Sequence, residues 1–216
     1  MSKVYGRFAA LRNVSVSFAA GSTSVVLGPN GAGKSTLLRM AAGLAEATRG
    51  EVRVFDGPVG RARGRVAYMS HAPMLYDELS AMENLQYFAR LSAGGGCDCV
   101  GSPEMALRAV GLDPGLRRPV GDYSQGMRQR TSFARVLQAD PELLLLDEPF
   151  SNMDVGSVEQ MVDLLRDFRT WLVVGGGVRT IVLTTHQSQL AMPLADCVVT
   201  LKDGELMPAE IAEVVR

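Results

Sequence analysis

The chain has 216 residues, 47% of them hydrophobic, which is enough to bury the core of one large domain. Its 22 basic and 23 acidic residues give a formal charge of −1, which excludes the broad positive field of proteins that attract nucleic acid. There is no apolar run of the roughly 20 residues that span a membrane, no apolar secretory signal at the start, and no disulfide framework in three cysteines, so we expect a reduced, cytosolic protein.

Short β-branched runs alternate with helical stretches along the chain, which predicts an α/β fold. The runs at 143–146 and 180–185 are apolar on both faces, as parallel strands covered by helices must be. Two of the other predicted strands end in hairpin turns at Asp56-Gly57 and Asp203-Gly204. These other strands cover residues 14–18, 24–27, 51–55, 65–69, 198–202 and 205–207. We expect Arg61, Arg63 and Arg65 to form a basic stripe on one strand face, solvated rather than in contact with lipid.

Residues 72–139 have helical patterning instead. Ser80 and Glu83 form a capping box before apolar residues at helical spacing, and a second helix starts at Pro103 and can end at Gly111. Between these helices, Ala93–Gly96 reads as a flexible joint and Cys97-Asp98-Cys99 as solvated loop thiols rather than a metal site. We predict one unit over 1–216, with a core of 1–71 and 140–216 interrupted by a helical insert over 72–139.

Residues 28–35 read GPNGAGKS, which matches G-x-x-x-x-G-K-[ST] between a predicted strand and a helix expected over 35–42. In such a loop, glycines let backbone N–H groups close around phosphate oxygens, and the helix N-terminus adds positive charge. Lys34 would reach the β- and γ-phosphates, and the Ser35 hydroxyl would ligate Mg²⁺. The sequence therefore predicts a nucleotide site at Gly28, Pro29, Asn30, Gly31, Ala32, Gly33, Lys34 and Ser35.

Two carboxylates and a histidine follow buried strands that should end at the same edge as this loop. Asp147 would reach Mg²⁺ through water, and Glu148 would polarise the attacking water as a general base. His186 could hydrogen-bond the γ-phosphate or that water. The alternatives are a plain strand-ending turn and a structural histidine, and the phosphate loop favours catalysis.

In this order, these segments resemble the ATP-binding subunits of ATP-binding-cassette (ABC) transporters, and the resemblance covers nearly the whole chain. GPNGAGKST, which extends to Thr36, looks like the phosphate loop of that family. DYSQGMRQR at 122–130 falls where the family signature lies, 151–154 looks like the D-loop, and His186 like the switch histidine. Tyr5 matches the aromatic residue that stacks on adenine.

The resemblance implies an α/β P-loop NTPase with a RecA-like core, an antiparallel β lobe and an inserted helical subdomain. It further implies a homodimer, or a pair with a similar ATPase chain, that sandwiches two ATP molecules with Mg²⁺ head to tail. Ser124 and Gly126 would contact the γ-phosphate bound by the partner chain, and Asp154 would belong to the same nucleotide site. Separate multi-span membrane subunits would be the other partners, with the chain peripheral on the cytoplasmic face of the inner membrane and no nucleic acid bound.

Some positions depart from the family pattern. Gln125 replaces a signature glycine, and the chain begins after the usual place of the first strand, so we expect a misassigned start or a missing strand. His71 stands where a glutamine normally couples Mg²⁺ and water to the membrane subunits, which makes it a candidate nucleotide and metal residue. The Ser70–Pro73 loop and the run at 78–88 look like the haem-exporter ATPases of cytochrome c maturation.

Three hypotheses from different classes follow. The leading one is an ATP-hydrolysing motor subunit of an exporter, with haem as the exported molecule, in which ATP closes the dimer and hydrolysis reopens it. The alternatives are the ATPase of a drug, lipid or polysaccharide exporter, and a soluble ABC ATPase without a membrane partner. A regulatory module with an inactive site is disfavoured, because the expected catalytic side chains are all present.

Overall fold

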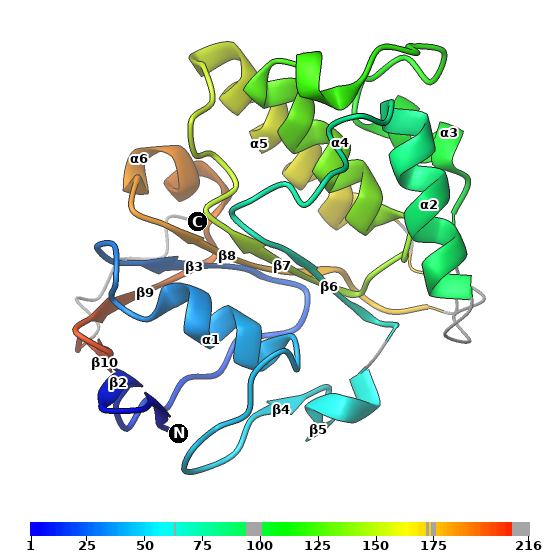
Figure 1. Ribbon diagram of the computed structural model, residues 1–216. Coiled ribbons are helices and arrows are strands. Elements are labelled where there is room, and N and C mark those ends of the chain that lie inside the picture. Colours follow the sequence, from blue (N-terminus) through cyan, green and yellow to red (C-terminus); the bar gives the residue numbers. More distant parts are fainter. Residues whose placement is uncertain (63, 94–100, 172, 174–175, 209–216) are drawn as a thin grey trace.

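The computed structural model describes residues 1–62, 64–93, 101–171, 173 and 176–208. Its centre is a six-stranded sheet in the order β10-β9-β3-β8-β7-β6, parallel except for β10 (Figure 1). The strands are β3 (Thr23–Leu27), β6 (Val66–Met69), β7 (Leu143–Asp147), β8 (Thr180–Thr185), β9 (Cys197–Lys202) and β10 (Glu205–Leu206). The α/β fold and these six strands are as predicted.

Successive side chains of the sheet point into two separate hydrophobic cores. On one face, Leu145 and Val182 pack with α1 (Lys34–Ala41). On the other, Leu144 and Ile181 pack with α4 (Gln125–Leu137) and α5 (Val155–Thr170), as the two sides of the sheet in Figure 1 show. Because both faces are covered, β7 and β8 are buried along their whole length, which explains their apolar sequence.

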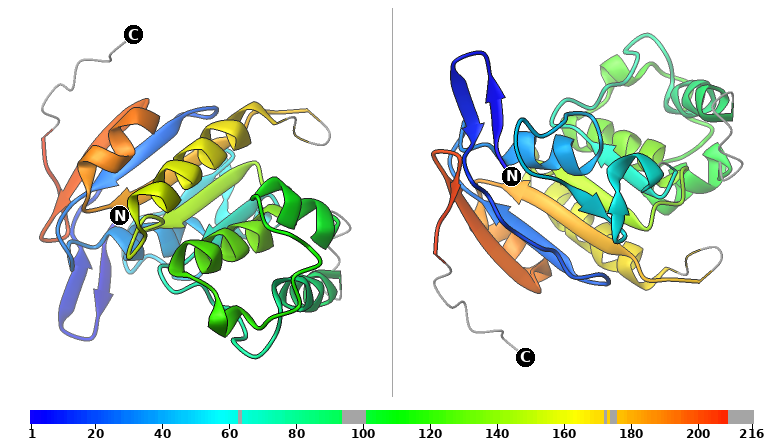
Figure 2. Two further views of the ribbon diagram at one scale, coloured as in Figure 1. Left: turned by 90° about the horizontal axis from the view of Figure 1, so that it is seen from above. Right: turned by 90° about the horizontal axis from the view of Figure 1, so that it is seen from below.

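The chain between β6 and β7 folds into α2 (Ala81–Ala93), α3 (Pro103–Ala109) and α4, which lie to one side of the sheet (Figure 2). The Ser80 N–H donates to the Glu83 carboxylate at 2.8 Å and the Glu83 N–H donates back to the Ser80 hydroxyl at 3.3 Å, so the predicted capping box is confirmed. Gly111 terminates helix α3, as predicted. Its φ of 68° turns the chain just after the helix, so that the Leu112 N–H donates to the Leu107 carbonyl.

Two small antiparallel hairpins complete the fold, with short helical segments at Val59–Ala62, Val120–Asp122, Ser188–Ala191 and Met192–Leu194. β4 (Arg53–Val54) and β5 (Gly57–Pro58) form the predicted hairpin, followed by a 3-10 turn at Val59–Ala62. β1 (Lys3–Tyr5) and β2 (Phe8–Leu11) form a second hairpin, which projects from the molecule in Figure 2 and was not predicted. Helix α6 (Ser188–Ala191) follows β8. Within the described residues, no helix has the length and apolar character needed to cross a membrane.

Two predictions from the sequence are wrong. Residues 14–18 form no strand, because their apolar side chains pack on the α1 core without a neighbouring strand to pair with. Arg61, Arg63 and Arg65 do not share a strand face, since Arg61 lies in the 3-10 turn and Arg65 precedes β6, where it pairs with Glu142. Arg63, Gly94–Gly96, Cys97 and Cys99 lie outside the described residues.

Candidate nucleotide site

The loop between β3 and α1 is shaped by glycines at positions of close backbone approach. Gly28 and Gly33 have φ angles of 152° and 102°. A Cβ atom would come within 2.2 Å of the Leu201 carbonyl oxygen at Gly28 and 2.5 Å of the Ala10 carbonyl oxygen at Gly33. Both positions therefore require glycine, and Lys34 begins α1 directly after the loop. This places the open N–H groups of a helix N-terminus beside the loop, an arrangement suited to phosphate.

A cavity of about 950 Å³ opens beside this loop at the carboxyl ends of β7 and β8. Most of the residues predicted for the nucleotide site line it. These are Asn30, Gly31, Ala32, Gly33, Lys34, Ser35, Thr36, His71, Asp147, Glu148 and His186. The sequence motifs, spread over more than half of the chain, thus converge on one cavity.

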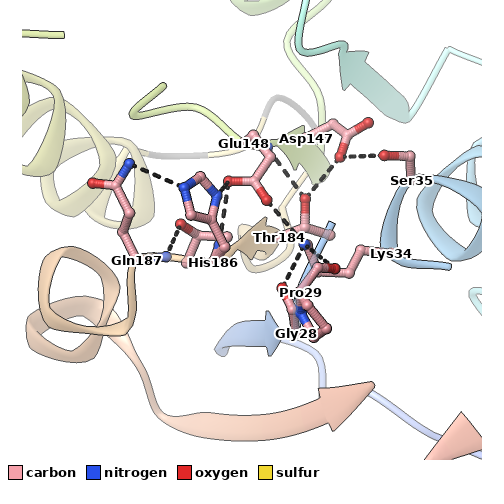
Figure 3. Close-up of polar contacts among 10 residues, drawn as sticks. Gly28, Pro29, Lys34, Ser35, Asp147, Glu148, Thr184, His186 and Gln187 are labelled. Carbon is pink, nitrogen blue, oxygen red and sulfur yellow. Dashed lines mark hydrogen bonds and ion pairs between the residues drawn. The ribbon is translucent and has the colours of Figure 1, made fainter. Parts of the chain in front are cut away.

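Lys34 is buried, and its ammonium group contacts three oxygen atoms of the site. Its ammonium donates to the carbonyl oxygens of Gly28 at 2.7 Å and Pro29 at 3.2 Å, and lies 3.0 Å from Glu148 Oε1 (Figure 3). Gly28 and Pro29 do not line the cavity themselves, but their carbonyls hold the lysine. The positive charge that would meet a phosphate is therefore balanced by Glu148.

The Glu148 carboxylate lies between Lys34 and His186, which orient it. Its second oxygen, Oε2, is 3.0 Å from His186 Nδ1 and accepts the His186 backbone N–H at 3.3 Å. The other imidazole nitrogen faces the Gln187 amide at 3.5 Å (Figure 3). Glu148 has a φ of 53°, an uncommon backbone conformation for a residue other than glycine, and such positions cluster at functional sites. This carboxylate is placed as a general base would be.

Asp147 is 2% exposed and its carboxylate accepts hydrogen bonds from three hydroxyl groups. Oδ1 accepts from Ser35 at 2.9 Å and Thr184 at 2.8 Å, and Oδ2 accepts from Tyr68 at 3.1 Å. Adjacent carboxylate and hydroxyl oxygens fit Mg²⁺, which commonly takes one or two protein oxygens and completes its shell with phosphate and water. The described residues contain no cluster of three acidic, histidine or cysteine side chains, which such a site does not need.

His71 lines the cavity and is exposed, but in the described part of the chain it forms no hydrogen bond with Ser35 or Asp147. Four predicted site residues lie outside the cavity altogether: Tyr5, Ser124, Gly126 and Asp154. Ser124 caps the N-terminus of α4, accepting the Met127 N–H at 3.3 Å. Asp154 caps α5 by accepting the Ser157 N–H at 3.0 Å.

Several residues of the site were missed by the sequence analysis. Phe8 is 62% exposed, lines the cavity and is paired with Tyr5 across the β1–β2 hairpin, so an aromatic ring other than the predicted one faces the nucleotide space. Arg39 and Gln187 also line the cavity, while Tyr68 and Thr184 hold Asp147 from behind. No motif marks these positions, because they become neighbours only when the sheet forms.

Comparison with known proteins agrees with this geometry. Residues 11–151 match the profile of the ABC transporter family. The chain is 37% identical over 204 residues to the fluoroquinolones export ATP-binding protein MT2762 of Mycobacterium tuberculosis, covering 92% of this chain and 64% of that protein. It is 37% identical over 211 residues to the taurine import ATP-binding protein TauB of Pseudomonas aeruginosa, covering 96% and 76%.

A third relative is the ABC transporter ATP-binding protein NatA of Bacillus subtilis, 32% identical over 203 residues and covering 92% and 80%. Among solved structures, the ATP-binding cassette MJ0796 in a dimeric post-hydrolysis state has a TM-score of 0.80 at 24% identity, covering 96% of this chain and 93% of that one. The fold is therefore that of ABC cassettes. With the family profile matched over most of its length and relatives above 30% identity, the chain belongs to the ABC transporter family and is an ABC-type ATPase domain.

Proposed function

We propose that this chain is the ATP-binding and ATP-hydrolysing motor subunit of a membrane exporter. The observation that supports it best is the convergence of Lys34, Ser35, Asp147, Glu148 and His186 on one cavity. Residues 1–71 and 140–216 would form the ATPase core, and 72–139 the helical subdomain that meets the membrane subunits. The cavity would hold ATP, with Phe8 or Tyr5 against the adenine ring.

The side chains of the cavity suit phosphoryl transfer to water. Lys34 would leave Glu148 for the negatively charged phosphates, which frees the Glu148 carboxylate to accept a proton from water. His186, 3.0 Å from that carboxylate, would keep it oriented. Ser35 and Asp147 would hold Mg²⁺, which neutralises charge on the phosphates, and His71 at the cavity wall would take the place of the usual glutamine.

A second copy of this chain, or a similar one, would complete each site. Ser124 and Gly126 lie outside the chain's own cavity, so a phosphate contact from them requires another chain. MJ0796, a fold relative, was solved as a dimer. Separate multi-span subunits would place the pair on the cytoplasmic face of the inner membrane, and cbiO1, another fold relative, is described as part of a transporter complex.

Export of haem is the specific form of this proposal, supported by His71 and the run at 78–88. A drug exporter is the second candidate, supported by the relative named for fluoroquinolone export. That relative is longer, since the chain spans 64% of its length, and a taurine-import relative matches equally well by identity. Purification of the tagged chain from native membranes, with mass spectrometry of bound proteins, separates the candidates. Small multi-span subunits of the cytochrome c maturation type support haem export, another permease supports the second candidate, and soluble partners alone contradict both.

The motor itself is tested with Glu148→Gln. Loss of the base should lower ATP hydrolysis by roughly 100-fold or more and trap an ATP-bound dimer that elutes earlier in size-exclusion chromatography. Lys34→Ala is the matched control, which should neither bind ATP nor dimerise. A Glu148→Gln chain that stays monomeric with ATP would contradict the sandwich mechanism.

A further inference from the structure

The carboxylate of Asp147 is held from both sides by different elements of the fold. The Ser35 and Thr184 hydroxyls, from α1 and β8, donate to Oδ1. The Tyr68 hydroxyl, from β6, donates to Oδ2 at 3.1 Å across 79 residues of sequence. With a donor on each oxygen, the carboxylate plane cannot rotate without breaking a hydrogen bond in a buried site.

The strand register explains why Tyr68 reaches Asp147. Tyr68 is the Cα partner of Leu145 in the parallel β6–β7 pair, and Asp147 is two residues further along β7. Side chains at a spacing of two point to the same face of a sheet. The hydroxyl of Tyr68 therefore lies beneath α1, on the face where Asp147 and Ser35 meet.

Helix α1 contributes two side chains to this site, Ser35 and, one turn later, Arg39. Arg39 follows Ser35 by four residues, which puts both on one side of α1. The guanidinium of Arg39 interacts with the Tyr68 hydroxyl, and this contact is the main cause of a raised pKa of Arg39. Ser35, Asp147, Tyr68 and Arg39 thus form a series of side-chain contacts that begins and ends on α1 and passes through β7 and β6.

Tyr68 is a hydrogen-bond donor at physiological pH. Burial raises the pKa of its hydroxyl, and the negative charge of Asp147 raises it further, with Arg39 opposing them. The hydroxyl is therefore neutral at physiological pH and can donate to the carboxylate. A phenylalanine at this position would keep the ring packing and lose only the donor.

We propose that Tyr68 is a positioning residue that fixes the Asp147 carboxylate for the bound divalent cation, and that Arg39 holds Tyr68 in place. This inference rests on the proposed function, since it concerns the metal that accompanies ATP. Thr184 and Ser35 hold one oxygen only. The orientation of the other oxygen depends on Tyr68.

The test is Tyr68→Phe in the full chain, with Mn²⁺ as the probe. The nucleotide-loaded protein is titrated with Mn²⁺ and followed by electron paramagnetic resonance, and nucleotide affinity is measured separately in EDTA. Outer-shell partners of metal ligands change metal affinity by 10- to 100-fold, so Mn²⁺ affinity should fall by about 10-fold while affinity in EDTA stays at the wild-type value. Arg39→Met should weaken Mn²⁺ binding in the same direction. Because Arg39 acts through Tyr68, the double variant should be no weaker than Tyr68→Phe alone.

Tyr87→Phe is the matched control, because Tyr87 lies on α2 and its hydroxyl contacts Tyr76 in the preceding loop, not the site. It should bind Mn²⁺ as the wild type does. Wild-type Mn²⁺ affinity in Tyr68→Phe, or an equal loss in Tyr87→Phe, overturns the inference and leaves the proposed function intact. A wild-type chain that binds no ATP overturns the proposed function itself. Should Tyr68→Phe fail to fold, Arg39→Met still decides, since Arg39 is exposed and its loss leaves the core unchanged.

Discussion

At the scale of single residues, Glu148 neutralises the charge of Lys34 within the site. The side chains of Lys34 and Glu148 are 5% and 12% exposed, so their ion pair is shielded from water. A phosphate that binds Lys34 would displace Glu148. The free energy needed to break the Lys34–Glu148 ion pair then reduces the free energy gained on nucleotide binding. In the proposed mechanism, the same displacement would free Glu148 for the attacking water, so that nucleotide binding and activation of the base would be coupled through Lys34.

Glu148→Gln should consequently bind a non-hydrolysable ATP analogue more tightly than the wild type, by about 10-fold, or about 1.4 kcal/mol. The amide carries no charge and releases Lys34 to the phosphates. Isothermal titration calorimetry measures the two affinities directly, without hydrolysis. Glu142→Gln makes the same chemical change outside the cavity and should leave the affinity unchanged. Equal affinity in Glu148→Gln and the wild type would show that the pair does not oppose binding.

At the scale of elements, strands buried on both faces were predictable, and exposed strands were predictable where an Asp-Gly turn marks the hairpin, as in β4–β5 and β9–β10. Residues 143–146 and 180–185 are apolar throughout because helices cover both sides of the sheet. The β1–β2 hairpin is short and largely exposed, so it leaves no alternating pattern, and the aromatic ring of Phe8 was missed with it. Residues 14–18 show the converse, since their apolar side chains pack on the core without pairing.

Gly126 illustrates a role that the signature motif did not indicate. A Cβ atom at this position would lie 2.2 Å from Ser157 Oγ and 2.7 Å from Ser157 Cβ, because the first turns of α4 and α5 pack closely. Gly126→Ala should therefore destabilise the single chain by about 1–3 kcal/mol, which lowers the melting temperature by roughly 2–4 °C per kcal/mol.

Differential scanning calorimetry of the nucleotide-free chain tests this prediction. Gly60→Ala is the control, because no atom lies within 4 Å of its added methyl group. Ser157→Gly should restore part of the loss when combined with Gly126→Ala, since it removes the atoms that clash. An unchanged melting temperature with loss of ATP-dependent dimerisation would assign Gly126 to the partner contact alone.

The start of β6 is joined to the start of β7 by Arg65 and Glu142. Two hydrogen bonds of 2.5 and 2.7 Å from the Arg65 guanidinium lower the pKa of the Glu142 carboxyl. The same guanidinium stacks on the Phe55 ring, with its central carbon 3.8 Å from the ring centroid. Because the folded-state pKa lies below the unfolded value of about 4.3, this stabilisation is present above that value and disappears as pH falls through the folded pKa. Urea unfolding should show Glu142→Gln less stable than the wild type at pH 7, with a smaller difference at a pH below the unfolded value. A difference that is the same at both pH values would contradict this account.

At the scale of the whole molecule, one chain supplies half of a proposed catalytic unit. The phosphate loop, Asp147, Glu148 and His186 could be placed from the sequence, because each directly follows a strand and parallel strands end at one edge of the sheet. The contacts of Tyr68 and Arg39 could not, since they depend on register and helix position. Ser124 and Gly126 remain apart from the cavity, and their assignment depends on a second chain.

Mixed dimers test that assignment. Lys34→Ala removes the phosphate contact of a chain's own site, and Ser124→Arg blocks the site of its partner, so each variant alone should be inactive. In a head-to-tail pair of the two variants, both lesions fall on one site and the other site is intact. Mixing equal amounts should then restore about a quarter of the wild-type ATPase rate if all pairings are equally stable, and about half if only the mixed pair closes, because each mixed dimer has one working site. The control mixes Lys34→Ala with a chain that carries both Lys34→Ala and Ser124→Arg. This mixture has no intact site and should stay inactive. If the first mixture is no more active than its components, Ser124 does not act on the nucleotide of the partner chain.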